Sequence, residues 1–159
     1  MRTGFGLDVH AFGGSPPLLL CGVAVDDARG LIGTSDADVA AHALCDALLG
    51  AAGLGDIGSH FPSGSSDFAG ADSMDFLAQV VEMVAAKGLT VAHVDVTIVA
   101  QTVRVAPHRD AMIGNLAGVL RIDRSLVSVK ATTTDGLGVI GRDEGIAAMA
   151  VATLRSSGA

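Results

Sequence analysis

One carboxylate and two imidazoles in the first third of the chain have the residue types and spacing of a metal site. Asp8 and His10 are two residues apart in a stretch that is typical of a β-strand, and alternate side chains of a strand project from the same face. His42 is the only imidazole of the helix expected over residues 39–49. Three protein ligands that leave a fourth position open are what a catalytic zinc ion uses. We therefore predict that Asp8, His10 and His42 bind zinc.

The alternative for His42 is an ordinary core histidine in an Ala-rich helix. Asp38 and Asp46 lie four residues before and after it, where helix geometry makes them its neighbours. Either carboxylate can accept the N–H of the ring nitrogen that does not bind the metal, as partners of zinc-bound histidines commonly do. These two neighbours favour the ligand role, and we expect Asp38 or Asp46 to support His42.

The elements that must position these residues are those of a mixed α/β fold. Apolar alternation predicts strands over 2–8, 91–101, 126–132 and 145–154, and a short hairpin formed by 18–20 and 23–25. Helices are predicted after an N-cap at Ser35, over 73–87 before Gly88, and from Pro107 to before Asp123. The glycines just before Asp8 allow backbone or a ligand to approach that strand closely.

The composition excludes several classes of protein. The 159 residues fit one domain, residues 1–159, whose core must be aliphatic because the chain has no Trp or Tyr and only five Phe. A net charge of −7 argues against a nucleic-acid surface. We see no membrane span and no secretory signal, and Cys21 and Cys45 are interpreted as buried free thiols. We expect a cytoplasmic protein that binds neither nucleic acid nor membrane.

Two other stretches carry polar groups suited to an anionic substrate. In the long loop over 50–70, Asp56 lies between glycines, and it either meets substrate hydroxyls or forms a turn. Three consecutive threonines precede Asp135 and Gly136. Their hydroxyls suit a phosphate, and the carboxylate suits a hard divalent cation; a plain Thr-rich turn is the alternative.

These motifs, taken in order, resemble one enzyme family along nearly the whole chain. The resemblance rests on Asp8-Val9-His10, Ser35-Asp36-Ala37-Asp38 with His42, Gly55-Asp56-Ile57-Gly58, Phe61-Pro62, Asp95-Val96-Thr97-Ile98, Ala100-Gln101, Pro107-His108, Lys130-Ala131-Thr132-Thr133-Thr134 and Gly141-Arg142-Asp143-Glu144-Gly145. Together they resemble the 2-C-methyl-D-erythritol 2,4-cyclodiphosphate synthases.

The resemblance implies both a fold and a reaction. The implied fold is α/β, a mixed four-stranded sheet with helices on one face, assembled as a homotrimer whose sheets face the threefold axis. Active sites then lie between adjacent subunits. The implied activity is that of a phosphorus–oxygen lyase (cyclase). It converts 4-diphosphocytidyl-2-C-methyl-D-erythritol 2-phosphate to the cyclic diphosphate and CMP in the non-mevalonate (methylerythritol phosphate) pathway of isoprene biosynthesis.

Roles for individual residues follow from the same resemblance. Asp8, His10 and His42 would bind Zn2+, Asp135 would bind Mg2+ or Mn2+, and Thr34 and Thr133 would act on the phosphates as catalytic residues. The other implied substrate-binding residues are Ser35, Asp56, Ile57, Gly58, Phe61, Ala100, Val103, Arg104, Val105, Ala106, Ala131, Thr132, Thr133, Asp135, Val139 and Arg142. Val139 and Arg142, with Ile140 and Glu144, match an axial channel that takes isoprenoid diphosphates; ordinary packing of the trimer core is the alternative.

Several positions depart from the family's pattern. Thr34 replaces a usual His, Ser63 an Asp, Asp135 a Glu and Gly136 a Lys, while Arg104 replaces a Lys and keeps its charge. The metal ligands are intact, so we expect zinc binding with reduced turnover. One alternative is a catalytically weakened trimeric zinc protein that binds cytidine nucleotides or isoprenoid diphosphates. A generic zinc hydrolase ranks last, since no Glu or His is evidently placed as a base for water.

Overall fold

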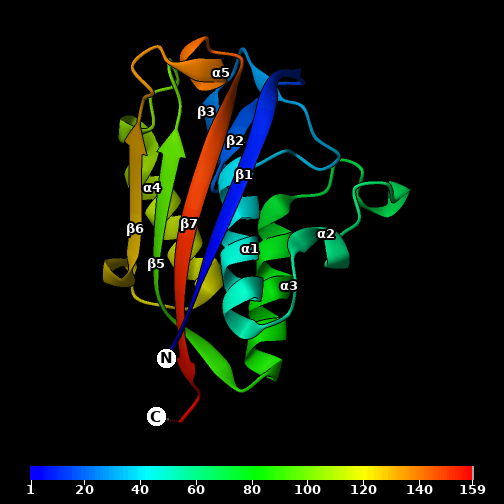
Figure 1. Cartoon of the computed structure of the whole chain (residues 1–159), viewed down its shortest axis with the longest axis vertical. Helices are drawn as coiled ribbons and strands as arrows, with labels where there is room; N and C mark the ends of the chain where they lie inside the picture. Colours follow the sequence, from blue (N-terminus) through cyan, green and yellow to red (C-terminus); the bar gives the residue numbers. More distant parts are fainter. Residues whose placement is uncertain (159) are drawn as a thin grey trace.

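The computed structural model, which describes residues 1–158, has two layers (Figure 1). One layer is a five-stranded mixed sheet in the order β4-β1-β7-β5-β6, and the long helices lie together on one of its faces. The strands are β1 (Arg2–Gly14), β4 (Gly30–Leu31), β5 (Leu89–Val99), β6 (Val127–Thr132) and β7 (Gly145–Ser156), with a separate hairpin of β2 (Leu18–Leu20) and β3 (Val23–Asp26). The helices are α1 (Val39–Ala52), α2 (Ile57–His60), α3 (Ser73–Ala86), α4 (Arg109–Leu120) and α5 (Gly138–Gly141).

The expected sheet of four strands is wrong by one strand. The short strand β4 pairs antiparallel with the end of β1, where Phe12 faces Leu31. Strand β1 itself continues to Gly14, well beyond the predicted residue 8, and so includes His10. A two-residue strand in a polar connection has no periodicity that a sequence could reveal. In the rest of the sheet β7 is antiparallel to β1 and β5, and β5 is parallel to β6.

Two glycines of β1 allow helix α1 to lie directly on the sheet. A Cβ atom at Gly6 would be 1.9 Å from the carbonyl oxygen of Ala43, and one at Gly4 would be 2.1 Å from that of Ala47. The glycines before Asp8 therefore serve a close approach of backbone to backbone. On its other side α1 contacts α3, so the helix is buried on most of its surface. This packing brings the start of α1 over the middle of β1.

Helix α1 begins at Val39, not after Ser35. The N-cap is Asp38, whose side chain accepts hydrogen bonds from the backbone N–H groups of Ala40 and Ala41. The Ser35 hydroxyl instead accepts from the Ala37 N–H within the preceding loop. The second helix is confirmed, with Gly88 at φ +69° just beyond its end. The third starts at Arg109 after a 3-10 turn over Ala106–His108.

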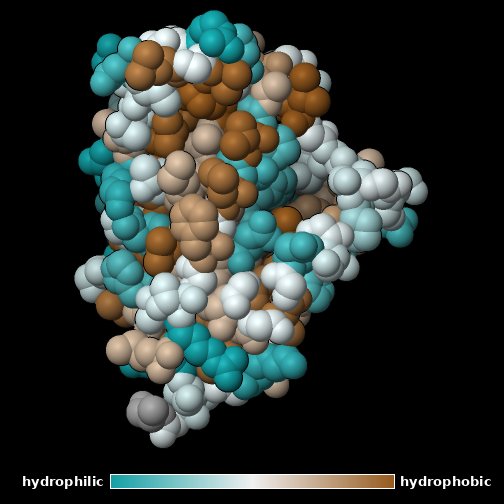
Figure 2. Space-filling model, viewed as in Figure 1, coloured by the Kyte–Doolittle hydropathy of each residue, from teal (hydrophilic) through white to brown (hydrophobic). Residues whose placement is uncertain are grey.

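The sheet face opposite the helices is not covered by other parts of the described chain. Its large apolar side chains are exposed, with Phe5 60% and Val9 52% accessible. Figure 2, which views this face, shows brown and tan atoms gathered over β1 and β7. Residues 1–158 include no helix that is both long and apolar enough to cross a membrane.

Candidate active site

The three predicted metal ligands converge. Asp8 and His10 project from β1, and His42 comes from the first turn of α1. The Asp8 Oδ2 atom lies 3.0 Å from His10 Nε2 and 3.0 Å from His42 Nδ1, and the two ring nitrogens are 3.3 Å apart. A tetrahedral metal with bonds of about 2.0–2.1 Å holds its ligands about 3.3 Å from one another. The donor set and its spacing therefore fit one divalent metal ion with a fourth position left for substrate.

Each imidazole is held by a hydrogen bond on its other nitrogen. His10 Nδ1 lies 2.6 Å from the carbonyl oxygen of Ile32. Because a carbonyl only accepts, Nδ1 carries the proton and Nε2 offers its lone pair to the metal. His42 Nε2 lies 2.8 Å from Ser73 Oγ and 3.2 Å from Ser35 Oγ.

The expectation that Asp38 or Asp46 supports His42 is wrong. Asp38 is fully buried and caps α1, and Asp46 accepts a hydrogen bond from the backbone N–H of Ile57. Both carboxylates thus accept hydrogen bonds from backbone N–H groups, because the N–H groups at the start of a helix and in the following loop need acceptors. Ser73 is 31 residues beyond His42 in the sequence, so no helical spacing connects them.

The electrostatics of the cluster keep Asp8 ionised. Burial alone would raise its pKa, but hydrogen bonds from His10 and His42 hold the pKa of this carboxyl well below its usual range. The hydrogen bond to Asp8 raises the pKa of His10, against the opposing effect of burial. A metal ion that takes these three atoms as ligands releases any proton that they share.

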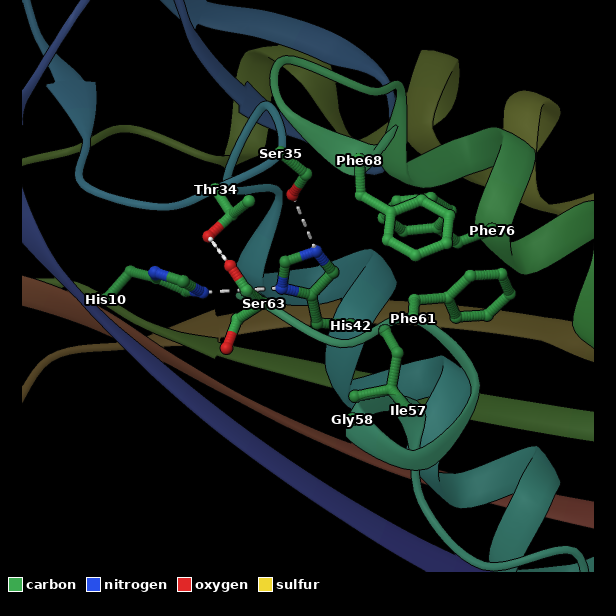
Figure 3. A pocket seen from close by; sticks show the side chains of 10 residues that line it. All are labelled: His10, Thr34, Ser35, His42, Ile57, Gly58, Phe61, Ser63, Phe68 and Phe76. Carbon is green, nitrogen blue, oxygen red and sulfur yellow. Dashed lines mark hydrogen bonds between the residues drawn. The ribbon is translucent and has the colours of Figure 1, made fainter. Parts of the chain in front are cut away.

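An apolar cavity of about 170 Å³ adjoins the metal ligands (Figure 3). In Figure 3, His10 lies at one end of the side chains drawn and three phenylalanines at the other, with His42 between them. The cavity also includes the predicted Thr34, Ser35, Ile57, Gly58 and Phe61. Prediction from sequence did not include Phe68 and Phe76, which pack against Phe61 at centroid distances of 5.6 and 4.5 Å.

Two residues that depart from the family pattern contact each other at the rim of this cavity. The Thr34 hydroxyl donates to the carbonyl oxygen of Ser63 at 3.0 Å. Thr34 thus holds the loop that follows α2. Asp56 does not line the cavity; its carboxylate caps α2 by accepting from the N–H and hydroxyl of Ser59, which lowers its pKa.

A second, wider pocket of about 650 Å³ lies where the parallel strands β5 and β6 end. It brings together residues that were predicted to bind substrate, from two stretches about 30 residues apart. The lining residues are Ala100, Gln101, Thr102, Val103, Arg104, Val105, Ala106, Pro107, Arg109, Ala131, Thr132 and Thr133. Arg104 and Arg109 are the cationic residues of its lining.

Arg29 forms hydrogen bonds beside this second pocket, a role that the sequence did not indicate. Its guanidinium donates to Thr102 Oγ1 and to Asp143 Oδ2, both at 3.0 Å, and to Asp26 Oδ2 at 2.7 Å. It also lies 4.6 Å from the ring centroid of Phe12. No periodicity or motif connects residues that are 73 and 114 positions apart.

Asp135 is separate from the other candidate ligands. Its backbone is left-handed, at φ +52°, and its carboxylate accepts from the Thr133 hydroxyl at 3.1 Å. Within residues 1–158, only Asp8, His10 and His42 form a group of three side chains spaced to share a metal. Any ion at Asp135 would need further oxygen ligands besides this carboxylate.

The predicted channel residues are on and after α5. Val139 and Ile140 line a small cavity with Val9 and Glu144, and Arg142 Nε donates to Glu144 Oε1 at 2.7 Å. Arg142 does not line that cavity, and Val139 is half exposed on the subunit.

Comparison with known proteins gives consistent matches along the chain. The model of the YgbB family matches residues 1–155. The chain is 51% identical over 158 residues to the 2-C-methyl-D-erythritol 2,4-cyclodiphosphate synthase of Pelotomaculum thermopropionicum, covering 99% of this chain and 98% of the relative. It is 54% identical over 155 residues to the bifunctional enzyme IspD/IspF of Novosphingobium aromaticivorans, covering 98% of this chain but 40% of that relative.

Solved structures of similar proteins have the same fold as this chain. The bifunctional IspDF from Campylobacter jejuni has a TM-score of 0.95 and 44% identity, covering 98% of this chain and 42% of that one. A CDP complex of IspF from Plasmodium falciparum has a TM-score of 0.85 and 32% identity, covering 98% of this chain and 96% of that one. The chain therefore spans about two fifths of the bifunctional relatives and nearly all of the single enzymes.

Proposed function

The chain belongs to the YgbB family, and we propose that residues 1–159 are one domain that catalyses the 2-C-methyl-D-erythritol 2,4-cyclodiphosphate synthase reaction. The reaction converts 4-diphosphocytidyl-2-C-methyl-D-erythritol 2-phosphate to the cyclic diphosphate and CMP, a phosphorus–oxygen lyase step of isoprenoid biosynthesis. The observation that carries the proposal is the convergence of Asp8, His10 and His42 beside a cavity. The chain is also 51% identical over 158 residues to a synthase.

The chemistry requires positioning more than a protein nucleophile. An oxygen of the 2-phosphate attacks the β-phosphorus, and the bond from that phosphorus to the oxygen of the departing CMP phosphate breaks. Because both groups belong to one molecule, the protein must fold the substrate into an in-line arrangement. Asp8, His10 and His42 would hold zinc, which when bound neutralises charge on the phosphates as a Lewis acid.

The chain's own residues would bind the two ends of the substrate. Ile57, Gly58 and Phe61 close the cavity beside the metal ligands, where we place the methylerythritol part and exclude water. The groove at the ends of β5 and β6 suits the cytidine, which the CDP complex of the Plasmodium falciparum relative supports. The Thr133 hydroxyl would donate to a phosphate, and Asp135 would help to hold magnesium or manganese.

The arrangement of the two pockets supports a homotrimer with active sites between subunits. In the sheet order, β1 is three strand spacings from β6, or about 14 Å at roughly 4.8 Å per spacing. A threefold rotation would bring the β1 side of one subunit next to the β6 side of another. It would also cover the apolar face that includes Phe5, Leu7 and Val9, since faces of this kind mark association surfaces.

The remaining parts of the proposal concern location and the trimer axis. We place the enzyme in the cytoplasm. Val139, Ile140, Arg142 and Glu144 would lie near the axis, where the family resemblance suggests isoprenoid diphosphates and ordinary subunit packing is the alternative.

The test is release of CMP from the diphosphocytidyl methylerythritol phosphate substrate, with zinc and magnesium present and then with EDTA. We expect metal-dependent CMP together with the cyclic diphosphate. Asp8→Asn should abolish it, whereas Asp27→Asn, the same change at an exposed loop position, should not. No CMP from a folded, zinc-loaded trimer would refute the proposal and favour the weakened binding protein. A large gain in rate from Thr34→His would identify a weakened enzyme.

A further inference from the structure

The hydroxyl of Ser73 connects the metal ligand His42 to a carboxylate. Among residues 1–158, Ser73 and the helix cap Asp38 are the polar or charged side chains that are buried. Ser73 begins α3, and its Oγ lies 2.8 Å from His42 Nε2. The same hydroxyl donates to Asp36 Oδ1, and its oxygen lies 3.2 Å from Ser35 Oγ.

The donors and acceptors of this group determine where the protons are. A hydroxyl has one proton to donate and an ionised carboxylate only accepts, so Ser73 donates to Asp36. The Ser73 oxygen must then accept at its contact with the ring, and His42 Nε2 carries the proton. His42 Nδ1 is then the ring nitrogen available to a metal, and it lies 3.0 Å from Asp8 Oδ2 and 3.3 Å from His10 Nε2. The Ser35 hydroxyl is free to donate to the second lone pair of Ser73 Oγ.

Backbone hydrogen bonds hold this group together. Asp36 Oδ2 accepts from the Ser73 N–H at 3.1 Å, and the Asp36 N–H donates to the carbonyl oxygen of Ala71 at 3.0 Å. The Gly70 N–H donates to the carbonyl oxygen of Thr34 at 2.8 Å. The loop before α1 and the start of α3 are thus joined at three points, which fixes the position of the Ser73 hydroxyl beside His42.

We propose that Asp36 and Ser73 are positioning residues that keep the proton of His42 on Nε2, so that Nδ1 serves as the metal ligand, and thereby set the affinity of the site for its metal. The inference rests on the metal site proposed above and not on the reaction. The contact with Asp36 makes Ser73 a stronger acceptor, and a stronger acceptor makes Nδ1 a better ligand. Losing a partner of this kind costs roughly 10–100-fold in metal affinity.

Two measurements on Ser73→Ala and Asp36→Asn test the proposal. The first is zinc affinity by competition with a chelator. The second is the 15N NMR shifts of the His42 ring in metal-free protein, which report the tautomer without any metal or substrate. We expect His42 Nε2 of the wild-type protein to carry a proton. Ser73→Ala should lose this preference and bind zinc roughly 10–100-fold more weakly, and Asp36→Asn should bind with an intermediate affinity.

Asp72→Ala is the matched control. Asp72 caps the same helix by accepting from the Met74 N–H, so its loss weakens the start of α3 without touching His42. Wild-type zinc affinity and tautomer in Ser73→Ala would overturn the proposal, as would an equal loss of affinity in Asp72→Ala. If Ser73→Ala does not fold, a wild-type tautomer and affinity in Asp36→Asn would overturn it. If the wild-type protein binds no zinc, the proposed metal site fails, and the tautomer measurement alone decides the role of Ser73.

Discussion

Replacing Gly6 by alanine tests the idea that backbone contact between β1 and α1 assembles the metal site. The new Cβ would lie 1.9 Å from the carbonyl oxygen of Ala43 and 2.8 Å from the Ala47 nitrogen. Ordinary contact between heavy atoms begins near about 3.5 Å, so α1 would have to move away by roughly 1.5 Å. The obstructing atoms are backbone atoms of a buried helix, and no side-chain rotation relieves them.

The cost follows from the overpacking and from its effect on His42. Overpacking of a core costs about 1–3 kcal/mol, and alanine in a strand recovers about 0.5–1 kcal/mol relative to glycine. Because the overlap is with backbone atoms, the cost lies at the upper end of this range, which leaves a net loss of about 2 kcal/mol, or about 4–8 °C in melting temperature for a domain of this size. His42 is adjacent to Ala43 in the sequence, so a shift of α1 at Ala43 also moves His42. Metal–ligand distances tolerate changes of only about 0.2 Å. Zinc affinity should therefore fall by more than the roughly 100-fold that follows loss of a supporting partner.

The assay is thermal unfolding by circular dichroism together with zinc competition against a chelator. Gly118→Ala is the control, because Gly118 is in α4 with nothing within 4 Å of the added Cβ. That change should stabilise the protein by up to about 1 kcal/mol and leave zinc affinity unchanged. A Gly6→Ala protein with wild-type stability and zinc affinity would refute the reasoning about the contact.

Three further predictions concern other parts of the molecule. Asp38→Ala should lower the free energy of unfolding by about 3–5 kcal/mol, because the N–H groups of Gly22, Ala40 and Ala41 lose their acceptor. Urea unfolding measures this change, and a loss below about 1 kcal/mol would contradict the prediction. Burial raises the pKa of the Cys45 thiol, whereas the unfolded chain ionises it near its usual value of about 8.5, so the free energy of unfolding should fall as pH rises above about 9. Cys45→Ala should remove about 1.4 kcal/mol per pH unit of that fall, and an unchanged slope would exclude this thiol as its source. Arg29→Met should weaken CMP binding, measured by calorimetry, about 5-fold, because Thr102 loses a hydrogen-bond donor. The control is Arg121→Met, which removes an exposed ion pair with Glu82 and should bind CMP as the wild type does.

The local pattern of the sequence determined the parts of the protein that depend on neighbours along the chain. Asp8 and His10 share a face because strand side chains alternate, and α3 could be predicted because its apolar stripe has helical spacing. The order of the motifs was enough to predict the family. The glycines before Asp8 signalled a close approach.

Only the tertiary structure decided which distant groups serve the same site. Asp38 and Asp46 have the helical spacing of partners for His42, yet each accepts hydrogen bonds from backbone, and Ser73 takes their place. Strand β4 and the contacts of Arg29 likewise depend on segments that meet after folding. A spacing rule describes which side chains share a face of one element. Which donor meets which acceptor depends on how the elements pack, because each buried polar group takes the partner that the packed structure brings within reach.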